Sequence, residues 1–279
     1  MAIVLALFSA IVYGASDYAG GRATRSAPLL AVTLCTQATT VVLAIVLVAI
    51  AGDPVPPGSD VAWSAAAGLA SLAGIFSFYE ALAKGEMTVV APITAVVSAV
   101  VPVVVGVATG ERPSVLAVCG VALALAAVAL ISGVAGRAAR PTTRRIIGLA
   151  LVAGVGFGLL FVFLDRTSDG SGFWPLCIGQ LTSFPLVIAL VVARRVPIRG
   201  IGRTRWLAVA AGALAISANA SYLLATREGL LSLVAVIASM YPATTVALAT
   251  TLDHERLTRP QVVGLGMAVT AVAMVSLGA

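Results

Sequence analysis

The chain has 279 residues, of which 60% are hydrophobic and only 10% are charged, and its net charge is +6 at pH 7. Soluble domains carry about 25% charged residues, so this composition excludes a water-solvated globular protein and predicts a chain surrounded by lipid. The basic excess does not indicate nucleic-acid binding, because the arginines are not interleaved with aromatic residues on one face.

Ten apolar segments of about the length that crosses a bilayer follow one another along the chain. They lie near residues 2–21, 29–51, 62–83, 87–108, 114–134, 146–164, 173–193, 206–226, 230–251 and 260–278. The first has no basic stretch before it, which favours a retained span over a cleaved signal peptide. We therefore predict an all-α integral membrane protein with ten transmembrane helices.

The second half of the chain repeats the first at an offset of 144 residues. The stretch GERPSVLAVCG begins at Gly110, and the stretch HERLTRPQVVG begins at His254. The matched residues are Gly14 and Gly158, Gly68 and Gly212, Ser77 and Ser221, Gly85 and Gly229, Glu111 and Glu255, Arg112 and Arg256, Gly120 and Gly264, and Ser132 and Ser276. Such matches are informative, because glycines and Glu-Arg pairs do not recur by composition alone as alanine and valine do.

Each half holds five predicted helices, so the second half enters the membrane from the opposite side. This is an inverted 5+5 repeat, an architecture that many secondary transporters share. We expect one repeat in residues 1–135, a basic linker in residues 136–145 and a second repeat in residues 146–279.

The first helix of each half also carries a stripe of small residues spaced four apart. The stripes are Ala6, Ala10 and Gly14 in the first half and Ala150, Gly154 and Gly158 in the second. Small residues at this spacing allow membrane helices to approach closely.

The basic residues predict the orientation of the chain in the membrane. Fourteen of the 17 Lys and Arg residues fall on the side that holds the linker, and only Arg112, Arg166 and Arg227 fall on the other. Cytoplasmic loops are the ones enriched in Lys and Arg. We therefore expect a multi-pass protein of the cell membrane with residues 136–145 in the cytoplasm and both termini outside.

Three stretches carry a resemblance to a known family. They are FYEALAKGEMTVVAPI (Phe78 to Ile93), the two Glu-Arg turns, and SMYPATTVALATTLDHER (Ser239 to Arg256). The sequence resembles the EamA-type transporters of the drug/metabolite transporter superfamily over nearly its whole length. In that family a proline precedes the Glu-Arg turn by 13 residues; Pro242 and Glu255 keep this spacing, whereas Ser98 takes the equivalent place in the first half.

The resemblance implies a layout in which helices 1 to 4 and 6 to 9 line a central cavity, with helices 5 and 10 at the periphery. It does not specify a substrate, because the family carries amino acids, nucleotide metabolites, other small metabolites and drugs. Many of its members keep both termini in the cytoplasm, and the charge distribution of this chain predicts the reverse.

No constellation of residues predicts an enzyme, a metal site or a bound cofactor. The chain has one lysine, Lys84, and one histidine, His254, and it has no phosphate-binding loop. Its three cysteines, Cys35, Cys119 and Cys177, lie in apolar runs at spacings that predict neither disulfides nor zinc ligation.

Two carboxylates, Asp17 and Glu80, each lie about one turn inside the end of a predicted helix. A charge in a membrane helix costs at least about 2.5–3.5 kcal/mol near the centre, so it persists where it faces a cavity or a partner. Asp17 either contacts Arg22 or Arg25 or binds a cation or proton on the cavity wall. Glu80 either pairs with Lys84 at i,i+4 or plays the same binding role.

A second set of candidates consists of uncharged polar and aromatic residues in the helices expected to line the cavity. These are Tyr13, Gln37, Tyr79, Ser98, Gln180, Asn219, Tyr222 and Tyr241. Each alone is explained by hydrogen bonding between helices, but together they predict a mixed polar and aromatic pocket. By contrast, Glu111, Arg112, Glu255 and Arg256 are expected to be structural, with the carboxylates capping the helices that follow.

These features favour a secondary transporter that moves a small organic metabolite by alternating access. Its partners would be the lipid bilayer, the substrate and a proton or another coupling ion, whereas the oligomeric state is not predicted. The alternative is an ion channel on a similar repeat. A channel needs rings of charge or a carbonyl filter, for which the only candidate is the glycine-rich run GVGFG from Gly154 to Gly158.

Overall fold

The computed structural model describes residues 1–108, 114–133, 143–228, 238, 241–254, 257 and 259–278. Within these ranges the chain is helical and has no strand. The α-helices are α1 (Ala2–Ser26), α2 (Leu29–Ala51), α3 (Gly58–Lys84), α4 (Met87–Ala108), α5 (Val115–Gly133), α6 (Arg144–Asp165), α7 (Trp174–Ala193), α8 (Arg205–Glu228), α10 (Tyr241–Leu252) and α11 (Arg259–Gly278). Two short 3-10 helices, Asp169–Ser171 and Ile198–Thr204, precede α7 and α8.

Each predicted segment overlaps one of these α-helices, although most of the first part of segment 230–251 is not described and the second part is α10. Among the described residues, six helices are long and apolar enough to cross a membrane. Large side chains on the outer faces, among them Phe8, Val42, Val192 and Leu277, are exposed. An exposed apolar surface of this kind is typical of a protein surrounded by lipid. The all-α membrane fold is therefore as predicted, whereas the ten-span inverted repeat stays a prediction.

Proline and glycine set the ends of the first helices. Pro28 precedes α2 and Pro57 precedes α3, where the N–H groups of a helix have no acceptor within it. Gly52 ends α2 in the left-handed conformation with φ 66°, and its N–H donates to the carbonyl of Val48 at 3.0 Å.

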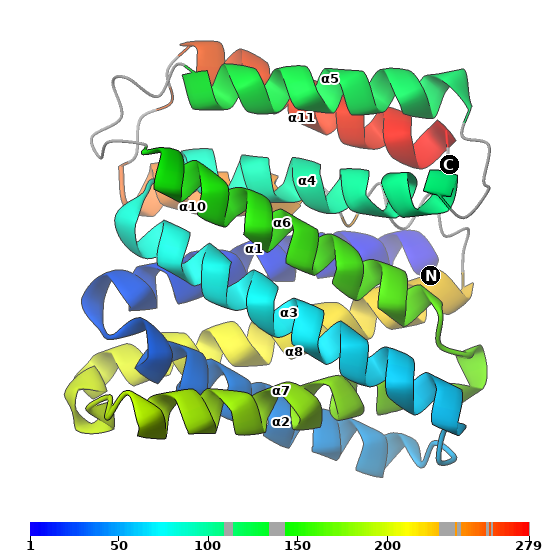
Figure 1. Ribbon diagram of the computed structural model, residues 1–279, viewed down its shortest axis with the longest axis vertical. Coiled ribbons are helices and arrows are strands. Elements are labelled where there is room, and N and C mark those ends of the chain that lie inside the picture. The colour runs from blue at the N-terminus through cyan, green and yellow to red at the C-terminus, as the bar shows by residue number, and fades with distance from the viewer. Residues whose placement is uncertain are drawn as a thin grey trace.

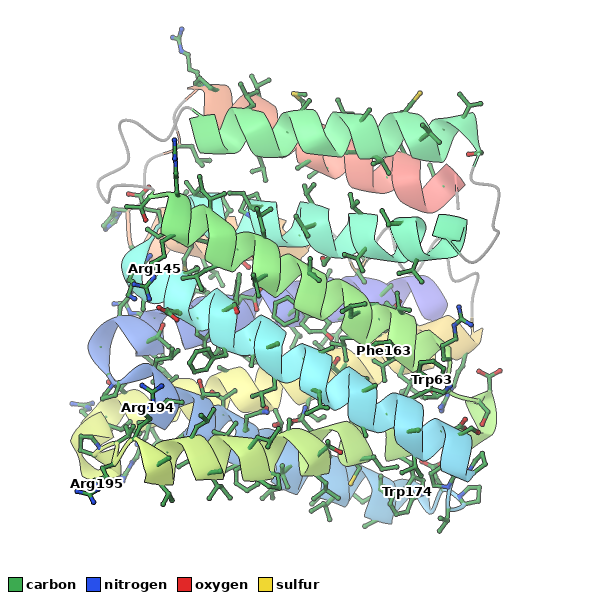
Figure 2. All side chains as sticks on the ribbon, in the orientation of Figure 1. Trp63, Arg145, Phe163, Trp174, Arg194 and Arg195 are labelled. Atoms are coloured by element: carbon green, nitrogen blue, oxygen red, sulfur yellow. The ribbon has the colours of Figure 1, made fainter. Side chains whose placement is uncertain are left out.

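The helices run roughly alongside one another, and both termini lie at the same end of the bundle (Figure 1). We call the other end the basic end, because it carries Arg22, Arg25, Lys84, Arg145 and Arg194. Figure 2 shows Arg145, Arg194 and Arg195 at this end and Trp63 and Trp174 toward the other, which we call the opposite end.

Helices α5 and α11 pack along each other at one edge of the bundle, and α2 and α7 lie at the other edge (Figure 1). Between these edges, α1 packs along α8, α3 packs along α6, and α4 contacts both α6 and α10. The positions of α5 and α11 agree with the peripheral place implied by the resemblance.

Glycines of the predicted stripes lie at close helix crossings. Gly14 of α1 faces the backbone of Tyr241 and Thr245 in α10, and Gly158 of α6 faces Val101 in α4. A side chain at either glycine would overlap the facing helix. The two crossings are equivalent under the offset of 144 residues, because Val101 corresponds to Thr245 as Gly14 corresponds to Gly158.

The largest core lies at the basic end. It is built around fully buried side chains of α3 and α4, among them Phe78, Tyr79, Leu82, Met87 and Ile93. A smaller cluster lies toward the opposite end and includes Leu164, Leu176 and Ile216. The bundle is therefore more closely filled at one end than at the other.

Candidate functional site

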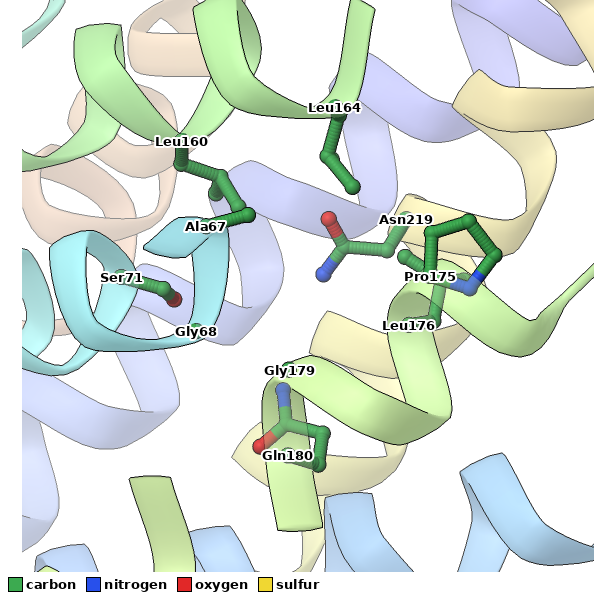
Figure 3. A pocket seen from close by; sticks show the side chains of 10 residues that line it. All are labelled: Ala67, Gly68, Ser71, Leu160, Leu164, Pro175, Leu176, Gly179, Gln180 and Asn219. Carbon is green, nitrogen blue, oxygen red and sulfur yellow. The ribbon is translucent and has the colours of Figure 1, made fainter. Parts of the chain in front are cut away.

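A small pocket, with room for about one water molecule, lies between α3, α6, α7 and α8. Figure 3 shows its lining residues, which are Ala67, Gly68, Ser71, Leu160, Leu164, Pro175, Leu176, Gly179, Gln180 and Asn219. It lies toward the opposite end, because Leu164 is near the end of α6 and Pro175 is in the first turn of α7. Apolar walls with a few polar groups are typical of sites for small organic molecules.

The polar groups of the pocket are Ser71, Gln180 and Asn219. Gln180 and Asn219 were predicted from the sequence, but Ser71 was not, although a serine inside helix 3 was a signal that could have found it. The apolar walls could not be singled out, because alanine, leucine and glycine occur throughout the chain.

Gln180 belongs to a polar contact between α2 and α7. Thr40 donates to the side-chain oxygen of Gln180 at 2.9 Å, and the Gln37 amide donates to the Ser183 hydroxyl at 3.0 Å. Gln37 is thus a buried link between two helices, and among these residues only Gln180 reaches the pocket wall.

Next to the pocket lies a cluster of tyrosines, which we call the tyrosine cluster and which comprises Tyr13, Tyr79, Tyr222 and Tyr241. Tyr13 of α1 donates a short hydrogen bond to the side-chain oxygen of Asn219, so it lies directly behind the pocket wall. The rings of Tyr13 and Tyr241 are 6.1 Å apart. Tyr222 stacks at a tilt on Phe161, with 5.4 Å between ring centroids.

One further predicted residue, Ser98, lies at this cluster. Ser98 of α4 lies close to the Tyr241 hydroxyl and donates to the carbonyl of Ala95 at 2.9 Å. The Tyr79 hydroxyl of α3 is buried close to the Thr36 side chain of α2 but, within the described residues, makes no hydrogen bond of good geometry. Residues that are far apart in the sequence are thus brought together from α1, α3, α4, α8 and α10.

Asp17 lies among these tyrosines, within electrostatic reach of Tyr13, Tyr79 and Tyr241. Its side chain is 8% exposed and makes no hydrogen bond or ion pair in the part of the chain that the structure describes. The predicted position one turn from a helix end is wrong, because α1 continues to Ser26. At 1.5 Å per residue, Asp17 lies about 13 Å inside that end.

Glu80 does not join the cluster. Its carboxylate accepts from Lys84 at 2.8 Å and from Arg145 at 2.7 Å, at the basic end of the bundle. The pairing with Lys84 was one of the two alternatives for this residue, and the contact with Arg145 of α6 was not predicted.

The predicted partners of Asp17 pair with another residue. Arg22 forms a short ion pair with Asp253, and Arg25 lies 3.4 Å from the second oxygen of the same carboxylate. Arg25 also donates to the carbonyls of Leu82 at 3.2 Å and of Gly85 at 3.1 Å. This set, which we call the basic-end latch, connects α1 of the first half with the end of α3 and with α10 of the second half.

Two neighbouring glycines of α1 complete the closure of the basic end. Gly20 of α1 lies directly against the Tyr79 ring, so that a Cβ atom at this position would overlap the ring. The neighbouring Gly21 faces Leu82 and Met87 in the same way. These two glycines allow α1 and the end of α3 to close over the tyrosine cluster from this side.

The opposite end is tied together by two aspartates that the sequence analysis did not single out. Asp60 at the start of α3 accepts from the backbone N–H of Ser168 at 3.0 Å and from the hydroxyls of Ser168 and Ser171. Asp53 accepts from the N–H of Phe173 at 2.7 Å. These bonds hold the α6–α7 loop against the start of α3, close in sequence to the pocket-lining residues Leu164 and Pro175.

Several predictions lie outside the described residues, namely those for Glu111, Arg112, Glu255 and Arg256 and most of the linker 136–145. The glycine-rich run from Gly154 to Gly158 is described, and it lies within the continuous helix α6. Gly154, Gly156 and Gly158 each face another helix, so this run serves helix packing.

Comparisons with known proteins complete this account. The sequence model of the EamA-like transporter family matches residues 1–133 and again residues 144–277. No curated protein matches the chain. A solved structure described as "Crystal structure of protein" has a TM-score of 0.64 and covers 99% of this chain and 96% of its own, at 16% sequence identity. A likeness at this identity concerns the fold alone. The family match, however, covers both halves, and the chain therefore belongs to the EamA-like transporter family of membrane proteins.

Proposed function

We propose that this protein is a secondary transporter that moves a small organic metabolite across the cell membrane by alternating access. Its working parts would be two five-helix units, residues 1–135 and 146–279, joined by the linker 136–145. The substrate would enter the pocket between α3, α6, α7 and α8 and contact Gln180, Asn219 and Ser71.

The pairing of helices supports two units related by an inverted repeat. An offset of 144 residues turns α1 into α6 and α3 into α8. The contact between α1 and α8 therefore corresponds to the contact between α6 and α3, and both contacts are extensive. Helices α1 and α6 run in opposite directions through the bundle (Figure 1).

The observation that carries the proposal is the difference between the two ends. At the basic end α1 packs against α3, and the basic-end latch joins the two halves. At the opposite end, within the described residues, the backbones of α6 and α8 do not approach closely; the two helices meet through side chains such as Phe161 and Tyr222, and both contribute residues to the pocket. A carrier needs states that are closed at one end and open at the other, and this arrangement fits one of them.

Roles for individual residues follow from their contacts. Asp17 is the candidate for binding a coupling ion or a charged group, because it is buried without an ion-pair partner in the described structure. Glu80, held by Lys84 and Arg145, is assigned to structure. The excess of Lys and Arg at the basic end favours a cytoplasmic location for that end.

The channel alternative has less support. Its sequence signal was the run from Gly154 to Gly158, and those glycines contact neighbouring helices inside α6. No other observation in the described residues favours a filter, so we retain the carrier as the single proposal.

Transport in proteoliposomes tests this proposal. Purified protein is first screened for small molecules that raise its unfolding temperature, because a ligand of the folded state stabilises that state. We expect radiolabelled hits to show saturable uptake and exchange against unlabelled substrate, and we expect Ser71→Trp, which fills the pocket, to abolish both. Unitary current steps carried by the purified protein would overturn the carrier assignment.

A further inference from the structure

Asp17 is the starting point, because it is a charged group deep in the bundle without a countercharge. The other charged side chains that the structure describes on the spanning helices lie near helix ends or in ion pairs. Arg22 and Arg25, the nearest basic residues along α1, are both engaged by Asp253. A buried ionised carboxylate is costly unless a cation or a proton neutralises it.

The groups around Asp17 favour a cation over other ligands. Tyr13 lies on its own helix, and Tyr79 of α3 and Tyr241 of α10 are within its electrostatic reach. Tyr222 of α8 adjoins Tyr13 from the other side. The face of a tyrosine ring attracts a cation within about 6 Å of the ring centre. An ionised carboxylate therefore attracts positive charge and repels an anion, and a tyrosine ring adds to the attraction where its face is turned toward the cation.

A continuous set of contacts leads from the pocket to this carboxylate. Asn219 lines the pocket and accepts the hydrogen bond of Tyr13. Tyr13 and Asp17 are four residues apart on α1, so they share a helix face and are about 6 Å apart along the axis. The pocket itself has apolar walls, with Leu160, Leu164 and Leu176 among them. The pocket as it stands has room for about one water molecule, so the apolar body of a ligand would have to part these walls, and its charged end would reach Asp17 once the Tyr13 ring turned aside.

We propose that the substrate is an organic cation, in which an ammonium group binds between Asp17 and the tyrosine cluster while its apolar body fills the pocket. The claim that the organic cation is transported rests on the proposed function. The claim that the cation binds does not depend on it, because Asp17 and the tyrosines form the same site whether or not the ligand crosses the membrane.

Binding to the purified full-length protein tests the inference with matched pairs of probes. Tetramethylammonium, choline and tetraethylammonium are compared by titration calorimetry with uncharged analogues of similar shape, such as 3,3-dimethyl-1-butanol for choline. We expect at least one of these cations to bind at least tenfold more tightly than its uncharged analogue. Binding of the cations no tighter than their analogues would overturn the proposal.

Variants identify the groups responsible. Asp17→Asn should weaken cation binding at least tenfold, whereas Glu80→Gln, which removes a carboxylate outside the site, should leave it unchanged. Tyr241→Phe keeps the ring and should bind cations nearly as well as the natural protein, whereas Tyr241→Leu should bind them several-fold more weakly. Unfolding temperatures show that each variant is folded, and folded Asp17→Asn protein with undiminished cation binding would contradict the inference.

Failure of this inference is distinguishable from failure of the transport proposal. If cations bind through Asp17 but no saturable flux occurs, the site is correct and the carrier is not. If saturable flux occurs for neutral or anionic compounds and is unchanged in Asp17→Asn, the carrier is correct and the cation site is wrong.

Discussion

The crossing of α1 with α3 at the basic end and the crossing of α6 with α8 at the opposite end occupy equivalent places in the two halves. Only the first is closed. At the closed crossing Gly20 lies against the ring of Tyr79. Under the offset of 144 residues, their counterparts are Leu164 and Leu223. Leu164 and Leu223 belong to one apolar cluster between helices whose backbones stay further apart, whereas the glycine at the basic end lets the α1 backbone meet a flat ring, so the two crossings differ in packing.

The charged residues that tie the helices together also differ between the two ends. Arg25 of the basic-end latch has Asp169 as its counterpart, so the second half has no basic residue at that position. The opposite end is instead tied by Asp60, which holds the α6–α7 loop close to the pocket-lining residues Leu164 and Pro175. Under the proposed carrier function the two crossings would be two similar gates, and the difference teaches that a few residues would decide which of them is closed in a given state.

The largest effect is expected from filling the closed crossing. Gly20→Leu places a side chain where the Tyr79 ring lies, and overpacking typically costs about 1–3 kcal/mol and occasionally more. Thermal unfolding in detergent should show a clear loss of stability. Gly148→Leu is the control, because no atom lies within 4 Å of a Cβ at that glycine. Equal losses in the two variants would mean that the Gly20 crossing is not specifically tight.

A smaller effect is expected at the open end from Asp60→Asn. The change removes a charged acceptor of hydrogen bonds from Ser168 and Ser171, and bonds to charged groups contribute about 1.5–3 kcal/mol each. We expect lower unfolding temperature and faster proteolysis within the α6–α7 loop. A cysteine introduced at the basic end as Thr24→Cys should be labelled at the same rate with and without Asp60→Asn. A change in that labelling rate would show that the two ends are not independent.

The basic-end latch should control the exposure of its own end. Arg25→Ala removes one contact with Asp253 and the bonds to the Leu82 and Gly85 carbonyls. A shift of about 1.4 kcal/mol corresponds to a tenfold change in the open population, and we expect the buried Thr24→Cys thiol to react up to about tenfold faster. Lys84→Ala removes an ion pair within α3 and serves as the control. If the two variants accelerate labelling equally, the latch has no special role.

The smallest effect is expected between α2 and α7. Gln37→Leu removes the hydrogen bond to Ser183, and such bonds between membrane helices contribute about 0.6 kcal/mol on average. The unfolding free energy should fall by that order, without a change in Thr24→Cys labelling. A loss above about 2 kcal/mol would indicate that this contact supports the pocket through Gln180.

The helices could be predicted from the sequence because a span in lipid requires a long apolar run. The ends of α1 and α3 could not, because both continue beyond their apolar runs. Arg22 and Arg25 lie in that added turn of α1 and are held by Asp253, more than 200 residues away in sequence. A local pattern carries no information about such a partner.

The site was predictable in composition but not in arrangement. Most of the polar candidates gather near Tyr13 and Asn219, because polar groups in lipid must find one another. Glu80 looked like Asp17 in the sequence, yet it lies in an ion pair with Lys84 and Arg145. The difference arises from which helix face meets which neighbour, and that depends on crossings set by residues such as Gly20.

The central claim is that, with the basic end closed, the pocket is reached only from the opposite end. It is tested in a background in which Cys35, Cys119 and Cys177 are replaced by alanine. A cysteine replaces Ser71 in the pocket and is protected by a substrate-sized blocker attached as a disulfide, while Arg22→Cys and Asp253→Cys are joined by a short thioether-forming cross-linker that reductant does not cleave. After reductant frees the Ser71→Cys thiol, we predict that it reacts with a membrane-impermeant reagent only from the side of the termini, and that the same protein without the cross-link reacts from the basic side as well. Reaction from the basic side while the cross-link is intact would contradict the account.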